Sequence, residues 1–145
     1  MNKVLISYQS FTGSCKALAE AAAKGVSEAG GQAEVKNVAE TSSADFAGRQ
    51  AFILVTTQPF QSLAGETKTF FERLWGQREK IESGLQFAAV ICHVNDAAST
   101  EANLDMFAKY FGWKKFGSWV EVSPKEAEAG KEAVRKLGIA VAQGG

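Results

Sequence analysis

The chain has 145 residues, and its 46% hydrophobic and 22% charged content is typical of one globular domain, here expected to span residues 1–145. Lysine plus arginine and aspartate plus glutamate number 16 each, so the formal net charge is zero, and a nucleic-acid-binding protein, which needs a basic excess, is not expected. The apolar runs are short compared with the roughly 20 residues of a membrane-spanning helix, which argues against a membrane protein.

The two cysteines indicate a reducing environment. Cys15 and Cys92 lie far apart in the sequence and form neither a Cys-x-x-Cys motif nor a metal-ligand spacing with the single histidine. We therefore expect reduced thiols and no bound metal. The first apolar run begins at Lys3, which leaves no room for a signal peptide, so we predict a cytoplasmic protein.

The first half of the chain reads as strands around one helix. Lys3–Tyr8 is a short apolar run with β-branched residues, typical of a strand buried on both faces. Apolar residues then recur at helical spacing until Gly30, which ends that helix. Gln32–Val38 alternates like an edge strand, and Ala51–Thr56 is a second buried strand. The weaker pattern of Ala39–Gln50 predicts a broken helix.

The second half alternates helix and strand. Helices are predicted over Glu66–Trp75 and Thr100–Phe111, and strands over Phe87–Val94 and Ser118–Val122. A final helix is predicted to begin near Pro124. We expect Ser99 or Thr100 to cap its helix. Most aromatic side chains are expected in the core, with Trp113 partly exposed.

This alternation predicts an α/β fold, namely a three-layer α/β/α sandwich around a doubly wound, five-stranded parallel sheet. Ligands of such sheets bind at the carboxyl ends of the strands. The loop after the first predicted strand lies at that edge. It offers the hydroxyls of Ser10, Thr12 and Ser14, a flexible Gly13 and the free N–H groups of the next helix, which together suit a phosphate group. The alternative is an ordinary turn in which Thr12 or Ser14 caps the helix.

The segment from Lys3 to Cys15 resembles the flavodoxin signature, an apolar strand followed by Thr/Ser-x-Thr-Gly-x-Thr. Ser10, Thr12 and Gly13 match it, whereas Cys15 stands where the family has its last threonine. We expect Cys15 to make a weak phosphate contact. It is not the nucleophile of a phosphatase, because the required arginine after five residues is absent.

Leu63–Leu74 is similar to the helix after the third strand in flavodoxins and related FMN-dependent reductases. The resemblance covers essentially the whole chain and corresponds to the short-chain type. It implies the flavodoxin-like strand order 2-1-3-4-5 and FMN as the cofactor. The phosphate of FMN would be held by Ser10, Phe11, Thr12, Gly13, Ser14 and Cys15.

In this fold the flavin ring lies between the loops after the third and fourth strands. The first of these loops would contribute Gln58, Pro59, Phe60 and Gln61, and the second His93, Val94, Asn95 and Asp96. Phe60 either lies on the isoalloxazine ring or packs on a neighbouring helix. Asn95 and Asp96 could meet the pyrimidine edge of the flavin, and His93 is either structural or close to N1 and O2 of the flavin.

Three functions remain open. The leading one is electron transfer through bound FMN, with a redox partner protein or a small-molecule electron donor or acceptor as its partner. The neutral net charge and the lack of glycine in residues 57–62 favour instead an NAD(P)H- or quinone-linked FMN-dependent reductase. The changed loop residues Cys15 and Pro59 are also compatible with a flavodoxin-like scaffold that has lost its flavin and binds partners.

Overall fold

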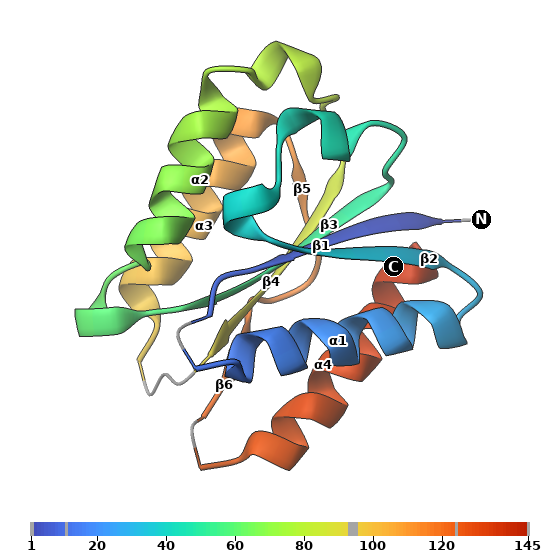
Figure 1. Ribbon diagram of the computed structural model, residues 1–145, viewed down its shortest axis with the longest axis vertical. Helices are drawn as coiled ribbons and strands as arrows, with labels where there is room; N and C mark the ends of the chain where they lie inside the picture. The colour runs from blue at the N-terminus through green and yellow to red at the C-terminus, as the bar shows by residue number, and fades with distance from the viewer. Residues whose placement is uncertain (1, 11, 93–95, 124, 145) are drawn as a thin grey trace.

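The computed structural model describes residues 2–10, 12–92, 96–123 and 125–144. They contain a parallel sheet with the strand order β2-β1-β3-β4-β5 (Figure 1). Its four main strands are β1 (Lys3–Tyr8), β2 (Gln32–Asn37), β3 (Ala51–Thr57) and β4 (Gln86–Cys92). The predicted order 2-1-3-4-5 is confirmed, and β2 is the edge strand that its alternating pattern predicted.

Helices cover both faces of the sheet. Figure 1 shows α1 (Ser14–Glu28) and α4 (Ala127–Ala142) side by side on one face, and α2 (Gly65–Trp75) and α3 (Ala98–Phe111) on the other. Successive residues of a strand point to opposite faces, so Leu5 belongs to the core under α2 and α3 while Val4 and Ile6 belong to the core under α1 and α4. The predicted three-layer α/β/α sandwich is confirmed. No helix in these residues is long and apolar enough to cross a membrane.

The core under α2 and α3 is largely aromatic. Trp113, which the sequence predicted to be partly exposed, is 6% exposed because it stacks on Phe111 at 4.7 Å and meets Phe87 edge-on at 5.0 Å between ring centroids. Trp75 instead lies at the border of this core and is 41% exposed.

Two glycines allow α1 and α4 to approach at backbone contact distance. A Cβ atom at Gly138 would lie 2.1 Å from the carbonyl oxygen of Ala22, and one at Gly25 would lie 1.9 Å from that of Arg135. Any larger side chain would therefore push the helices apart.

The fifth strand position differs from the prediction, because two short strands share it. β5 (Lys114–Lys115) pairs with the beginning of β4, and β6 (Val120–Val122) pairs with its end. Between them Gly117 adopts φ 62°, and Trp119 leaves the predicted strand to pack on Phe87. The indole Nε1 of Trp119 donates to Asp105 at 3.0 Å.

The segment predicted as a broken helix forms two 3₁₀ turns, η1 (Val38–Glu40) and η2 (Ser43–Phe46). The predicted cap of α3 is wrong, because the helix begins earlier and its N-cap residue is Ala97. The carboxylate of Asp96 accepts the backbone N–H of Ala98 at 3.0 Å instead. Pro124 lies outside the described residues, and α4 begins at Ala127.

Candidate functional site

The turn between β1 and α1 leaves the helix N-terminus open. The N-cap residue is Gly13, whose left-handed φ of 92° suits glycine and which supplies no side-chain cap. Its N–H donates to the hydroxyl oxygen of Ser10 at 2.7 Å, and the hydroxyls of Thr12 and Ser14 lie 3.2 Å apart. The alternative in which Thr12 or Ser14 caps α1 is therefore not observed. The first N–H groups of α1 lack intrahelical partners and are free to bind an anion.

A cavity of about 220 Å³ lies beside this turn at the carboxyl edge of the sheet. It is lined by Ser10, Thr12, Ser14, Cys15, Thr57, Gln58, Pro59 and Cys92. The structure thus brings the predicted phosphate loop together with the first two predicted residues of the loop after β3. Phe11 lies outside the described residues.

Cys15 and Cys92 meet at this cavity, a contact that the sequence did not predict. Their Sγ atoms are 2.8 Å apart, and each residue is only 1% exposed. The neighbouring Cys15 sulfur, together with burial, raises the pKa of the Cys92 thiol well above its usual range. Cys92 is therefore protonated at neutral pH.

Gln9 connects the ends of β1 and β3, and sequence reasoning missed it. It is fully buried, and its Oε1 accepts the backbone N–H and the hydroxyl of Thr57 at 3.1 and 2.7 Å. Its Nε2 has no partner among the residues that the structure describes. The signal in the sequence was a polar residue directly after an apolar strand, next to a ligand-binding turn.

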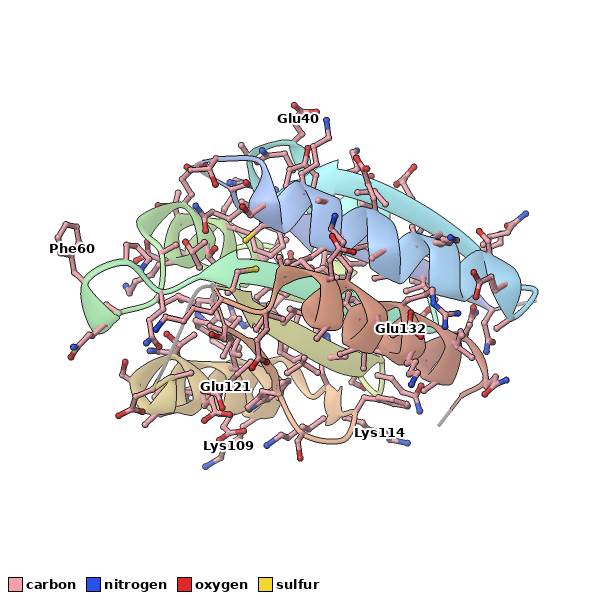
Figure 2. The ribbon with its side chains drawn as sticks, turned by 90° about the horizontal axis from the view of Figure 1, so that it is seen from below. Glu40, Phe60, Lys109, Lys114, Glu121 and Glu132 are labelled. Atoms are coloured by element: carbon pink, nitrogen blue, oxygen red, sulfur yellow. The ribbon has the colours of Figure 1, made fainter. Side chains whose placement is uncertain are left out.

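The loop after β3 contains the 3₁₀ turn η3 (Pro59–Gln61) and two residues in the left-handed region. Phe60 has φ 54° and Gln61 has φ 62°, conformations that cost a non-glycine residue free energy. Phe60 is 100% exposed and stands away from the body of the molecule at the end of the loop (Figure 2). The alternative in which Phe60 packs on a helix is therefore wrong, and its ring is free to contact a ligand.

The loop after β4 is described from Asp96 onward, so the predictions for His93, Val94 and Asn95 fall on residues outside the description. The carbonyl oxygen of Asp96 accepts the side-chain amide of Gln58 at 2.7 Å. The hydroxyl of Ser99 donates to the carbonyl oxygen of Gln61 at 2.6 Å. These two hydrogen bonds join the two loops that were predicted to flank the flavin ring.

Comparisons with known proteins show which solved structures share this fold. No protein-family model matches the sequence, and no curated protein does. Solved structures do match over the whole chain. An archaeal flavodoxin aligns with a TM-score of 0.86 and 15% identity over 98% of this chain and 97% of its own. Two-electron reduced Megasphaera elsdenii flavodoxin aligns with a TM-score of 0.79 and 21% identity over 97% and 98%.

The same fold occurs as part of larger proteins. The rubredoxin:oxygen oxidoreductase of Desulfovibrio gigas matches with a TM-score of 0.82 and 16% identity over 99% of this chain but 36% of its own. The molecule is thus a doubly wound α/β protein in which the N-terminus of α1, without a side-chain cap, lies at the carboxyl edge of the sheet. More particularly, it has the flavodoxin fold, as the resemblance of its first strand and turn implied.

Proposed function

We propose that this protein binds FMN and transfers electrons through the bound flavin. The observation that carries the proposal is the open N-terminus of α1, surrounded by the hydroxyls of Ser10, Thr12 and Ser14 beside a cavity, in a flavodoxin fold. Phosphate groups bind at such helix ends because the N–H groups point outward and the helix dipole is positive there. When bound, FMN supplies the redox chemistry.

The residues present fit the phosphate of FMN. Three hydroxyls converge on the cavity from the turn before α1, and the left-handed Gly13 opens the backbone toward it. The 220 Å³ cavity is smaller than a typical pocket for a whole cofactor of roughly 300–1,000 Å³. It therefore matches the phosphate end, and the ring would lie farther out, along the joined loops.

The ring end is formed by chain segments that hold one another in place. Gln58 and Ser99 connect the loop after β3 to the beginning of α3, and Phe60 presents an uncovered aromatic face. Because Phe60 and Gln61 already adopt positive φ, the lack of glycine in residues 57–62 does not prevent left-handed backbone in this loop. The loop geometry thus removes one of the two sequence arguments against an electron carrier.

The second argument, the zero net charge, still favours an NAD(P)H- or quinone-linked FMN-dependent reductase as the alternative function. A carrier needs a redox partner protein, whereas a reductase takes electrons from a small molecule. We place the protein in the cytoplasm, since both of its cysteines are free thiols. Oxidation of NADH or NADPH by the FMN-loaded protein without a partner protein would identify the reductase.

The test is a comparison of FMN with riboflavin, which lacks the phosphate, by titration of flavin fluorescence and visible absorption. We expect FMN to bind at least about a hundredfold more tightly than riboflavin, because two or more charge-assisted hydrogen bonds depend on the phosphate. Ser10→Ala should weaken FMN binding about tenfold and leave riboflavin binding unchanged. The control is Ser27→Ala, an exposed position near the other end of α1.

Two results would contradict the proposal. If FMN does not bind, the fold serves as a scaffold without flavin. If FMN binds no more tightly than riboflavin, the N-terminus of α1 is not the phosphate site.

A further inference from the structure

Two cysteines far apart in the sequence bring their sulfur atoms together at the cavity beside the turn between β1 and α1. Cys15 lies in the first turn of α1, and Cys92 is the last residue of β4. Both are free thiols, and their Sγ atoms are 2.8 Å apart. A covalent S–S bond measures about 2.05 Å, so a side-chain movement of less than about 1 Å would close it.

Both cysteines line cavities next to α1. Cys15 and Cys92 line the cavity of about 220 Å³ beside the phosphate turn. Cys92 also lines a second cavity of about 210 Å³ between the beginnings of α1 and α4. Buried thiols in a closed core are inert, whereas these two residues, although each is only 1% exposed, line cavities that lead toward them.

We propose that Cys15 and Cys92 are a redox-active pair that forms a reversible intramolecular disulfide. The oxidant is a small-molecule disulfide of the glutathione type. The Cys15 thiolate attacks one sulfur of the oxidant, a mixed disulfide forms, and the first thiolate leaves and takes up the proton of Cys15. Cys92 then loses its proton, its sulfur attacks Cys15 Sγ, and the second thiol leaves. Two protein thiols are oxidised and one small disulfide is reduced to two thiols.

The surroundings of the two sulfurs assign their roles. Cys15 lies in the first turn of α1 and lines the cavity beside the turn between β1 and α1, where the oxidant would approach, so it is the attacking thiol. Cys92 is held protonated by its neighbour and by burial, so it acts second, as the resolving thiol. This division also explains why neither cysteine needs a Cys-x-x-Cys motif, because the fold supplies the proximity.

The pair can be tested on the flavin-free protein, so its outcome is independent of the proposed FMN site. The reduced protein is equilibrated with mixtures of reduced and oxidised glutathione, quenched with acid, unfolded and alkylated with N-ethylmaleimide, and its mass is measured. We expect both thiols to disappear together. Half of the protein should be oxidised in a mixture in which the concentration of reduced glutathione is still at least about tenfold that of oxidised glutathione. A peptide containing Cys15 should then be linked to one containing Cys92.

Single variants separate the roles. Cys92→Ser should accumulate a mixed disulfide with glutathione at Cys15, whereas Cys15→Ser should react at least about tenfold more slowly. The proposal is overturned if the wild-type protein keeps two alkylatable thiols throughout, or if it yields disulfides between molecules or stable mixed disulfides alone. The wild-type result alone decides whether the disulfide forms, so the proposal is tested even if a variant fails to fold.

Discussion

The side-chain amide of Gln58 donates a 2.7 Å hydrogen bond to the carbonyl oxygen of Asp96, from the loop after β3 to the loop after β4. The hydroxyl of Ser99 adds a second connection by donating to the carbonyl oxygen of Gln61. The two loops that would hold the flavin ring therefore act as one unit. A change in either loop should alter the position of the other.

Removal of the Gln58 connection should weaken flavin binding at the ring end. We expect Gln58→Leu to lower the affinities for FMN and riboflavin by the same factor, about three- to tenfold, because the hydroxyls and N–H groups proposed to bind the phosphate belong to the turn before α1 and are unchanged. Fluorescence titration with both flavins measures this. Gln143→Leu, at an exposed position after α4, is the control. A loss confined to FMN would show instead that Gln58 acts on the phosphate turn.

The left-handed backbone of Phe60 predicts opposite effects on stability and on binding. The side chain is fully exposed, so Phe60→Gly removes no packing and relieves roughly 1–2 kcal/mol of strain, partly offset by chain entropy. We expect the free energy of unfolding of the flavin-free protein to rise by about 0.5–1 kcal/mol in urea denaturation. FMN affinity should fall about three- to tenfold, because the aromatic face is lost.

Matched variants separate these two effects. Phe60→Tyr keeps the ring and should retain FMN affinity. Ser62→Gly, at an extended position with φ −134° in the same loop, should lower stability, because glycine gains nothing there. If Phe60→Gly binds FMN as tightly as the wild-type protein, Phe60 does not contact the flavin ring.

The layers and the strand order could be predicted from the sequence because they follow from strong local patterns. The apolar runs of β1, β3 and β4 are short, as is typical of strands buried on both faces, and Gly13 after β1 marks the turn to α1. The split fifth strand could not be predicted, because Trp119 packs on Phe87 in the aromatic core and is not part of the strand Val120–Val122. Similarly, the exposure of Trp113 depends on partners that are distant in the sequence.

The candidate site was predictable where it depends on one turn and hidden where it depends on several strands. Ser10 and Thr12 belong to a single local motif. The contact between Cys15 and Cys92 requires α1 to lie over the sheet so that its first turn reaches the end of β4, although β3 separates β1 from β4. The role of Gln9 in connecting the ends of β1 and β3 can be inferred only once its hydrogen-bond partner Thr57 is known. Such contacts follow from register and helix placement, which a sequence pattern does not contain.

The close contact between α1 and α4 makes Gly138 important for stability. In Gly138→Ala, the new Cβ would lie 2.1 Å from the carbonyl oxygen of Ala22, so the helices must separate. We expect the free energy of unfolding to fall by at least about 2 kcal/mol in urea denaturation. Gly65→Ala, at the first residue of α2 with open space around its Cβ, should leave stability unchanged or slightly raise it. Equal losses in the two variants would show that the contact is not responsible.

Bound FMN should protect the cysteine pair from oxidation, because both sulfurs line the cavity proposed for the phosphate. The phosphate would also occupy the space through which the oxidant reaches Cys15, the attacking sulfur. We expect saturating FMN to slow disulfide formation by oxidised glutathione at least about fivefold, measured by timed quenching and alkylation. Riboflavin at equal occupancy should slow it less, since it has no phosphate to fill this cavity. If FMN binds but leaves the rate unchanged, Cys15 and Cys92 still form their disulfide, and the phosphate lies outside this cavity.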